Sequence, residues 1–356
     1  MKKKFKKLQA KRDLRRKEKE QAKAIPSSVP NITNTSIAQH RDEVLGSARK
    51  LIYPLQHSKH KIVLVSTSVF VISLIVFFTY TTLSLYRFQQ NNIFLYRVTQ
   101  VVPFPIARVG SEFVAYENYL FELRRYVHFY VRQQRLDFEN NQLDRTQLEA
   151  FRQQALDRII SFVYVKRLAD TNNVDVSDAE VDYNVELLRS QNRLGSNEEQ
   201  LDDVLQKFYG WNRGDFERYL YQDLLAQKVT EALDPDTTAR ANKAKAELDS
   251  GADFADVAKK YTDDVTTKEN GGEFGFKIKQ DARDITPKAA EALFGLKKGE
   301  ISKVINTGYS LEIFMIIDKK DNTVEAAHIQ FNFKDISGPL NDLKEESPAR
   351  EYVTFN

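Results

Sequence analysis

The sequence predicts an α+β protein with one transmembrane helix, a domain that is nearly all helical, and a second domain of mixed helices and strands. Three observations indicate this organisation. Residues 62–86 carry no charge, residues 88–234 place apolar side chains at helical spacing, and strand-like alternation dominates residues 301–333. The 356 residues also exceed a typical single domain of about 100–200 residues, which leaves room for two folded units and an anchor.

The uncharged segment 62–86 is expected to span a membrane. With a rise of about 1.5 Å per residue the segment reaches roughly 37 Å, and a hydrocarbon core is about 30 Å thick. A buried helix of a soluble domain rarely runs this long without a charge. A cleaved signal peptide has an apolar region of about 7–15 residues close to the N-terminus, whereas 61 residues precede this segment. We therefore expect an uncleaved anchor that contacts membrane lipid.

The segment before the anchor is strongly basic. Residues 1–61 hold 17 Lys and Arg against 5 Asp and Glu, a net charge of +12, so the rest of the chain carries −9. Basic flanks remain in the cytoplasm, which places the C-terminal domains outside it. A nucleic-acid or ribosome tether is the alternative for these residues. A topology-setting tail that touches anionic lipid needs no extra partner, and we expect no nucleic acid to bind.

Cysteine and histidine usage excludes several kinds of site. The chain has no cysteine, which rules out a disulfide framework, a thiol nucleophile and a cysteine-based metal site. Its five histidines are scattered without metal-binding spacing, so we expect no metal.

Helical patterns follow one another after the anchor. A strand or extended segment turns at Gly110 and leads into the first helix. Ser177 followed by Glu180 forms the pattern of a capping box, which marks a helix start. We expect helices at about 116–136, 146–171, 176–192, 198–209 and 212–233.

The pattern changes at Pro235, because proline disfavours helix at the residue before it. A short helix ends at Gly251, a plausible glycine stop, and a second short helix follows. The pair Gly271–Gly272 introduces a strand. Thr286 and Pro287 fit the cap and first position of another helix. Strand patterns then run to Phe333, so this domain is α+β.

The motifs of this second domain occur in a specific order. They are "KAKAELDSGADFADVAKKYTDD", then "NGGEFGF", then "AEALFGLKKGEISKVINTGYSLEIFMIID". Residues 245–318 thereby resemble a parvulin-type (PpiC-type) peptidyl-prolyl isomerase domain, which implies a small antiparallel sheet with surrounding helices. Residues 104–233, with "QALDRIISFVYVKRLADTNNVDVSDAEV" and "FERYLYQDLLAQKV", are similar to the N-terminal chaperone region of SurA- and PrsA-type folding factors.

The two resemblances imply a membrane-anchored extracytoplasmic folding factor. The expected parts are a basic cytoplasmic tail at 1–61, a transmembrane helix at 62–86, a SurA-N-like chaperone domain at 88–234, a parvulin-like domain at 235–333 and a C-terminal tail at 334–356. The implied partners are unfolded or newly exported polypeptides, and no cofactor is implied. The sequence carries no signal of the oligomeric state.

The resemblance also implies site residues. Asp264 matches the acidic residue or cysteine that the family places near the substrate carbonyl, although it also fits a solvated Asp-Asp turn. Ile285 and Phe294 match apolar pocket positions. Two positions depart from the family pattern. Ala289 stands where a second pocket aromatic is usual, and Glu312 stands where a histidine is usual.

The strand that normally opens a parvulin domain, which carries a histidine, is missing before residue 243. A matching stretch, "AAHIQF" with His328, lies instead near the C-terminus within residues 323–333. Only 28 residues follow His328, too few for a second repeat, so we expect a circularly permuted domain. Residues 311–317 and 323–331 should form a hairpin centred on Lys320, with Glu312 directly opposite His328. A structural histidine without a catalytic role is the alternative.

Two functions remain open. The first is a foldase that binds unfolded exported proteins and catalyses cis/trans isomerisation of X-Pro bonds, with Asp264, His328 and Glu312 as catalytic residues. The second is a holdase chaperone whose isomerase domain is inactive, which Ala289 and Glu312 favour.

Overall fold

The structure is a computed structural model, and it describes residues 33–52, 55–138, 141–195 and 197–355. The chain divides into two compact units, the first ending at Tyr80 and the second beginning at Thr81. Residues 1–32, which hold most of the basic charge predicted to set the topology, lie outside the described residues.

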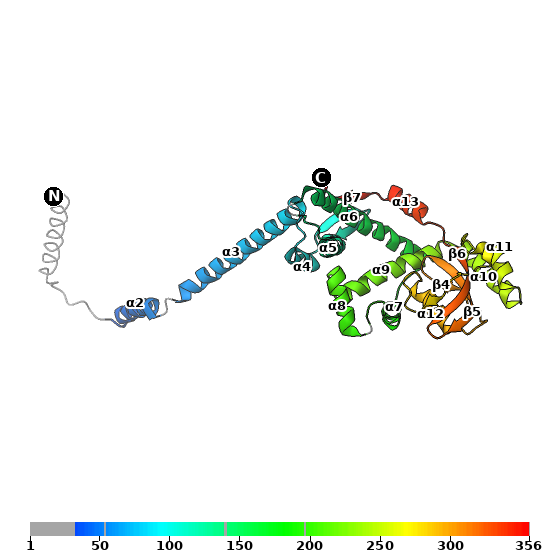
Figure 1. Ribbon diagram of the computed structural model, residues 1–356. Coiled ribbons are helices and arrows are strands. Elements are labelled where there is room, and N and C mark those ends of the chain that lie inside the picture. The colour runs from blue at the N-terminus through cyan, green and yellow to red at the C-terminus, as the bar shows by residue number, and fades with distance from the viewer. Residues whose placement is uncertain (1–32, 53–54, 139–140, 196, 356) are drawn as a thin grey trace, which may run out of the picture. The chain divides into compact units, whose positions relative to one another are not determined.

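The first unit consists of helices in its described part. They are α2 (Asn34–Ile52) and α3 (Leu55–Thr82) up to Tyr80, both labelled in Figure 1. Among the described residues, one helical stretch, 61–87, is long and apolar enough to cross a membrane. Its apolar side chains are largely exposed through Val76, as lipid-facing side chains would be.

The C-terminal end of the predicted span is not a lipid-facing surface. Residues Leu83–Arg87 form a π-helical turn in which Leu85 is completely buried. The hydroxyl of Tyr116 donates a hydrogen bond to the Leu85 carbonyl over 2.6 Å, and Tyr86 donates to the Pro105 carbonyl over 2.5 Å. The last turn of the apolar run therefore packs within the second unit, which begins at Thr81, although it is part of the candidate span 61–87.

A helical domain forms the first part of the second unit. Its elements are α4 (Ile93–Val101), β1 (Pro105–Val109), β2 (Glu112–Ala115), α5 (Tyr116–Gln133), α6 (Gln142–Thr171), α7 (Asp178–Ser190), α8 (Glu198–Tyr209) and α9 (Arg213–Ala232). The predicted capping box is present, since the Ser177 hydroxyl accepts from the Glu180 N–H and the Glu180 carboxylate accepts from the Ser177 N–H. Tyr119 on α5 is 1% exposed and belongs to the core of this domain.

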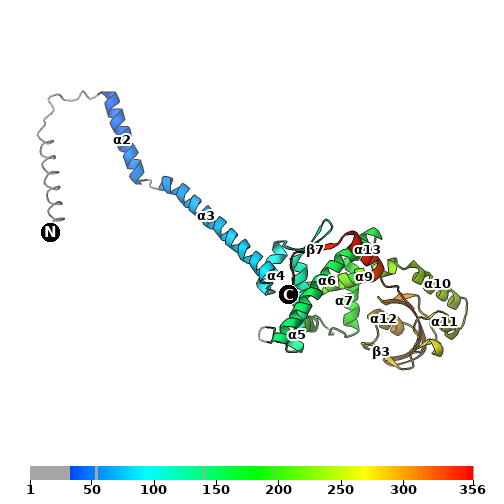
Figure 2. The same cartoon turned by 90° about the horizontal axis from the view of Figure 1, so that it is seen from above.

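Residues 334–356, predicted as a tail, complete this helical domain instead. They form α13 (Ser337–Glu346) and β7 (Ala349–Glu351). Strand β7 pairs antiparallel with β1, which gives a three-stranded sheet in the order β2-β1-β7. Val353 lies in the same core as Tyr119, and the Phe355 ring stacks on Tyr119 with centroids 5.6 Å apart. In Figures 1 and 2, α13 and β7 lie beside α6, although the whole α+β domain separates them from the helices α4 to α9 in the sequence.

The α+β domain is therefore an insertion between α9 and α13. Its elements are α10 (Pro235–Asp249), α11 (Phe254–Tyr261), the 3₁₀ turn Lys268–Asn270, β3 (Ile278–Lys279), α12 (Pro287–Gly295), β4 (Ile305–Asn306), β5 (Ser310–Lys320) and β6 (Thr323–Asn332). The strands form an antiparallel sheet in the order β3-β6-β5-β4. As predicted, residues 323–331 pair with residues 311–317.

Helices cover both faces of this sheet. Helices α10 and α11 pack against Ile313, Ile329 and Phe331 on one face. Helix α12 packs against Phe314 and Ala326 on the other face. The side chains of a strand alternate between its faces, so His328 shares the α12 face with Phe314.

The helical domain forms hydrogen bonds to the loop that leads into α12. The Arg193 guanidinium donates to the carbonyls of Ala282 and Ile285, each over 2.7 Å. The side-chain amide of Gln191 donates to the Pro287 carbonyl over 2.7 Å. Residues just after α7 thus hold the start of α12 in place.

Candidate active site

His328 lies between two carboxylates. Its Nδ1 is 2.9 Å from Glu312 Oε2, and its Nε2 is 2.9 Å from Asp264 Oδ2. The side chain of His328 is 5% exposed, that of Glu312 12% and that of Asp264 17%. The structure therefore brings together the three residues that the sequence analysis named as catalytic candidates, and Asp264 is the most accessible of them.

Asp264 is held by the loop that follows α11. This loop runs along β6, where the Asp263 N–H donates to the Gln330 carbonyl over 2.7 Å. Asp264 Oδ1 accepts from the Thr266 N–H over 2.9 Å and Oδ2 accepts from the Thr267 hydroxyl over 2.7 Å. Burial raises the pKa of Asp264, but the hydrogen bonds from Thr266, Thr267 and His328 outweigh it and hold the pKa well below its usual 3.8. The carboxylate is ionised at neutral pH.

Glu312 reaches His328 diagonally rather than from the opposite position. The predicted register is wrong, because Glu312 pairs with Gln330 and the residue opposite His328 is Phe314. The tight turn is Asp321–Asn322 rather than a turn centred on Lys320, and Asp321 has the left-handed φ of 51° that short hairpin turns favour. Diagonal neighbours on one face remain within reach of long side chains, so the contact forms.

The second carboxylate oxygen of Glu312 is also bonded. Oε1 accepts from the Thr307 hydroxyl over 3.0 Å and from the Ser310 hydroxyl over 3.1 Å. These bonds orient Oε2 toward the imidazole of His328. Glu312 thus contacts His328 through one carboxylate oxygen and two hydroxyl groups through the other.

The two carboxylates favour the charged form of His328. Burial lowers the pKa of His328, but hydrogen bonds and charge attraction from Glu312 and Asp264 outweigh it and raise the pKa above its usual 6.5. A neutral ring would leave one nitrogen lone pair facing a carboxylate. The imidazolium instead donates from both nitrogens, and Thr267 Oγ1, 3.2 Å from Nε2, lies at the same donor.

The glycine pair makes room for the His328 strand. The His328 N–H donates to the Gly272 carbonyl over 2.8 Å. Gly272 has a φ of 88°, and a Cβ at this position would lie 2.3 Å from the His328 carbonyl oxygen. Only glycine fits this turn, which explains the "NGGEFGF" motif in physical terms.

Two aromatic rings flank His328, and the sequence analysis did not assign them to the site. The Phe274 ring centroid lies 4.3 Å from the imidazole centroid, and Phe314 lies near-parallel at 6.5 Å. Phe274 lies two residues after the glycine pair, within the "NGGEFGF" motif, which is the signal that could have identified it. Two residues further along the chain, Phe276 is 52% exposed, and its ring centroid is 5.9 Å from that of Phe274.

The predicted apolar pocket residues lie on the same side of the sheet but are mostly core. Ile285 is 8% exposed and Ala289 is 3% exposed, and both pack in one cluster with Phe314. Phe294 is partly buried against this cluster. The structure thus gathers Ile285, Ala289 and Phe294 near the His328 face, with Ala289 fully covered by its neighbours.

Two family profiles match the chain. A rotamase family, described as the PPIC-type PPIASE domain, matches residues 224–318. A SurA-like N-terminal domain family matches residues 55–230. The first match ends before strand β6, so the strand that carries His328 lies outside it.

Individual relatives agree with these matches. Foldase protein PrsA of Clostridium tetani is 23% identical over 246 residues, which cover 59% of this chain and 68% of that protein. Foldase protein PrsA of Halalkalibacterium halodurans is 24% identical over 207 residues, covering 50% and 61%. Chaperone SurA of Methylobacillus flagellatus is 33% identical over 122 residues, covering 33% and 27%. The chain therefore matches only part of each relative.

A solved structure is also similar in sequence. The crystal structure of the foldase protein PrsA from Lactococcus lactis is 16% identical, and the match covers 68% of this chain and 83% of that one with a TM-score of 0.23. The family matches, in contrast, cover the helical region and the α+β domain in the order that these folding factors have. The chain belongs to the SurA/PrsA-type folding factors and carries a parvulin-type peptidyl-prolyl cis-trans isomerase domain.

Proposed function

We propose that the protein is a membrane-anchored extracytoplasmic foldase that binds unfolded exported polypeptides and rotates their X-Pro bonds. The observation that carries this proposal is the ionised and partly accessible carboxylate of Asp264, held by His328 behind it. Catalysis of this rotation breaks no covalent bond. It needs only a lower barrier than the about 18–20 kcal/mol of the free peptide bond.

The chemistry of Asp264 follows from amide resonance. The planar amide carries partial negative charge on its carbonyl oxygen, and the twisted transition state carries less. A carboxylate beside this oxygen repels the planar form more than the twisted form, which reduces the double-bond character of the C–N bond. In this mechanism Asp264 contacts the substrate carbonyl, whereas His328 and Glu312 are positioning residues that keep the carboxylate in place.

The apolar contacts for proline would come from the aromatic side chains near His328. Phe276 is exposed, and Phe274 and Phe294 lie between the core and the surface. These rings supply the surface that Ala289 lacks. A circular permutation, in which β6 replaces the usual first strand, accounts for the position of His328 in this chain.

A protease-coupled isomerisation assay on the full-length chain in lipid nanodiscs tests the activity. Asp264→Asn should lower kcat/KM for an X-Pro peptide by about tenfold or more, because the repulsion at the carbonyl is lost. Asp281→Asn, which removes an exposed carboxylate with no hydrogen-bonding partner among the described residues, is the matched control. Equal activity of Asp264→Asn and the parent protein would exclude this mechanism.

A holdase without isomerase activity is the second candidate. It is favoured by Ala289, which is 3% exposed and offers no ring to proline, and by His328, whose ring nitrogens are both occupied. A protein that slows the aggregation of an unfolded client but leaves the isomerisation rate unchanged would be a holdase.

The anchoring and orientation are a further part of the proposal. The exposed apolar face of α3 and the basic residues before it support a cytoplasmic N-terminus. Protease added outside spheroplasts should digest residues 88–356 and spare residues 1–61. The reverse pattern would overturn the extracytoplasmic placement and leave the isomerase assay to be judged separately.

A further inference from the structure

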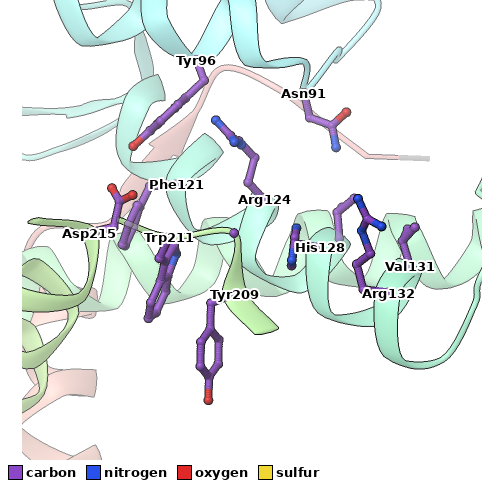
Figure 3. Close-up of a pocket in the computed structure, with 12 residues that line it drawn as sticks. Asn91, Tyr96, Phe121, Arg124, His128, Val131, Arg132, Tyr209, Trp211 and Asp215 are labelled. Carbon is purple, nitrogen blue, oxygen red and sulfur yellow. The ribbon is translucent and has the colours of Figure 1, made fainter. Parts of the chain in front are cut away.

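A pocket of about 280 Å³ opens in the helical domain, and all the residues that line it precede the isomerase domain in the sequence. Figure 3 shows that α5 forms its floor, while Tyr96 comes from α4 and Trp211 from the turn between α8 and α9. None of its lining residues belongs to the isomerase domain or to the mechanism proposed above.

One wall of the pocket is built from aromatic rings. Trp211 stacks on Phe121 with centroids 5.6 Å apart and on Tyr209 with centroids 5.0 Å apart. Tyr209 and Val131 are more than one-third exposed, so the apolar wall continues to the mouth of the pocket. Gly210, with a φ of 68°, lies against His128, where a Cβ would be 2.8 Å from Nδ1. The turn that carries Trp211 therefore packs closely against His128, which leaves no room for a side chain at Gly210.

Three buried polar atoms of the residues that line this pocket have no hydrogen-bonding partner in the described part of the chain. They are Tyr96 Oη, Arg124 Nη1 and Trp211 Nε1. Tyr96 is 8% exposed and Trp211 is 5% exposed, so water has little access to these side chains. Buried polar groups in folded proteins are nearly always paired, and an unpaired one is costly. The indole N–H and the guanidinium N–H can only donate, which calls for an acceptor on a ligand.

The charge of the pocket selects an anionic acceptor. Arg124 makes no ion pair with a described residue, although the charge of Asp215 acts on it from a distance, and its guanidinium lies over the Tyr96 ring, 4.6 Å from the centroid. Burial lowers the pKa of Arg124 from its usual 12.5, which reflects its loss of hydrating water. Arg132 adds a second positive charge. Asp215, the carboxylate of the lining, already accepts from the Asn212 N–H over 3.0 Å.

We propose that this pocket binds a polypeptide segment in which a carboxylate lies next to an aromatic or large aliphatic side chain. The carboxylate accepts from Arg124 and Trp211, and the apolar side chain lies on the ring wall. The inference rests on the proposed function, because it names the chemistry by which the helical domain recognises an unfolded client. The carboxylate belongs either to the C-terminus of the client or to an Asp or Glu side chain.

The chain offers a direct probe, since Trp211 is its single tryptophan. Peptides without Trp, Tyr or Pro are titrated into the full-length chain in nanodiscs, and the fluorescence of Trp211 is followed. Three peptides are compared: one that ends in Phe with a free carboxylate, the same peptide as the C-terminal amide, and the amide with Glu placed before Phe.

We expect the free-carboxylate peptide to shift the Trp211 emission. The plain amide should bind with an affinity that is lower by about tenfold or more. Recovery of binding by the Glu-containing amide assigns recognition to acidic side chains, and absence of recovery assigns it to the C-terminus. Binding of the plain amide with undiminished affinity would overturn the proposal, because no carboxylate would then be recognised.

Variants separate the pocket from general electrostatics. Arg124→Gln should lower the affinity for the carboxylate peptide about tenfold. Arg135 is an exposed arginine of the same region that does not line the pocket, so Arg135→Gln should leave this affinity unchanged. Trp211→Phe retains a ring but loses the donor, and its binding is read from the anisotropy of a labelled peptide. Unchanged affinity in both Arg124→Gln and Trp211→Phe would overturn the proposal.

The same samples keep this inference distinct from the proposed function. Isomerase activity should be unaffected by Arg124→Gln. If no peptide binds while the parent protein still isomerises X-Pro bonds and slows client aggregation, the pocket assignment is wrong and the foldase proposal stands. If peptides bind the parent protein, and the Arg124→Gln protein keeps the parent's thermal unfolding midpoint but no longer slows client aggregation, the pocket is a client site.

Discussion

The residue directly opposite His328 on β5 is Phe314, yet the histidine bonds to Glu312, two residues away on the same strand. The ring of Phe314 offers no acceptor, whereas the Glu312 side chain is long enough to cross diagonally. Asp264 occupies the other ring nitrogen from a loop 64 residues away in sequence. The network therefore joins two strands and one loop through a single imidazole.

Replacement of Glu312 by Gln should lower the pKa of His328. The amide carries no charge to stabilise the imidazolium, and we expect a loss of about 1.5–3 kcal/mol in the free energy of unfolding from the weakened charged hydrogen bond. The histidine pKa is measured by NMR titration of residues 81–356, with the His328 signal assigned from its absence in His328→Gln. Glu325→Gln, an exposed carboxylate on β6, is the control. An unchanged pKa in Glu312→Gln would contradict the geometry.

Stability should depend on pH through the same network. The pKa of folded His328 is raised above 6.5, so its contribution is complete below pH 6.5 and is lost as the pH rises through the folded value. The pKa of folded Asp264 is lowered below 3.8, so its contribution is complete above pH 3.8 and is lost as the pH falls through the folded value. The network is therefore most stabilising between these two pH values.

Urea unfolding of the parent protein and of His328→Gln at several pH values measures this dependence. The difference in unfolding free energy between the two should be largest in mildly acidic solution and should shrink in alkaline solution. A difference that grows with rising pH would mean that His328 is neutral in the folded protein.

Gly272→Ala should damage the site far more than Gly275→Ala. Both glycines have positive φ, 88° and 75°, so both substitutions incur the backbone strain of about 1–2 kcal/mol. Only at Gly272 would the added Cβ meet the His328 carbonyl oxygen, whereas nothing lies within 4 Å at Gly275. Urea unfolding and isomerase activity should both separate the two variants. Equal losses would show that strain, and not close approach to β6, explains the glycine pair.

The C-terminal segment should stabilise the helical domain. Val353→Ala removes a buried side chain from its core and is expected to cost about 1.5–3 kcal/mol of unfolding free energy. Arg350→Ala changes an exposed residue of β7 and should cost less than about 0.5 kcal/mol. Thermal and urea unfolding measure both. A Val353→Ala protein as stable as the parent would mean that residues after β7 do not contribute to this core.

Much of the local structure was predictable because its causes are local. The cap at Ser177, the start of α12 at Thr286 and Pro287, and the helix end before Gly251 depend on neighbouring backbone groups and on side chains within one turn. The hairpin of β5 and β6 was likewise predictable from alternation and a turn. Resemblance to a family then supplied the roles predicted for Asp264 and His328, which the sequence patterns by themselves do not assign.

The exact pairing and the domain boundaries were decided by tertiary packing. A one-residue irregularity between Ile316 and Asp318, together with the turn at Asp321–Asn322, shifted the register, since alternation is satisfied equally by neighbouring in-phase registers. Strand β7 reached β1 across more than 230 residues, and no local signal marks a partner so distant. The sequence by itself determined the long apolar helix, the other helices and the two kinds of domain, because these depend on the hydrophobicity and spacing of nearby residues. Only the tertiary structure decided that Glu312 and Asp264 share His328 and that the last residues close the helical core, because those contacts depend on how distant segments bury their side chains together.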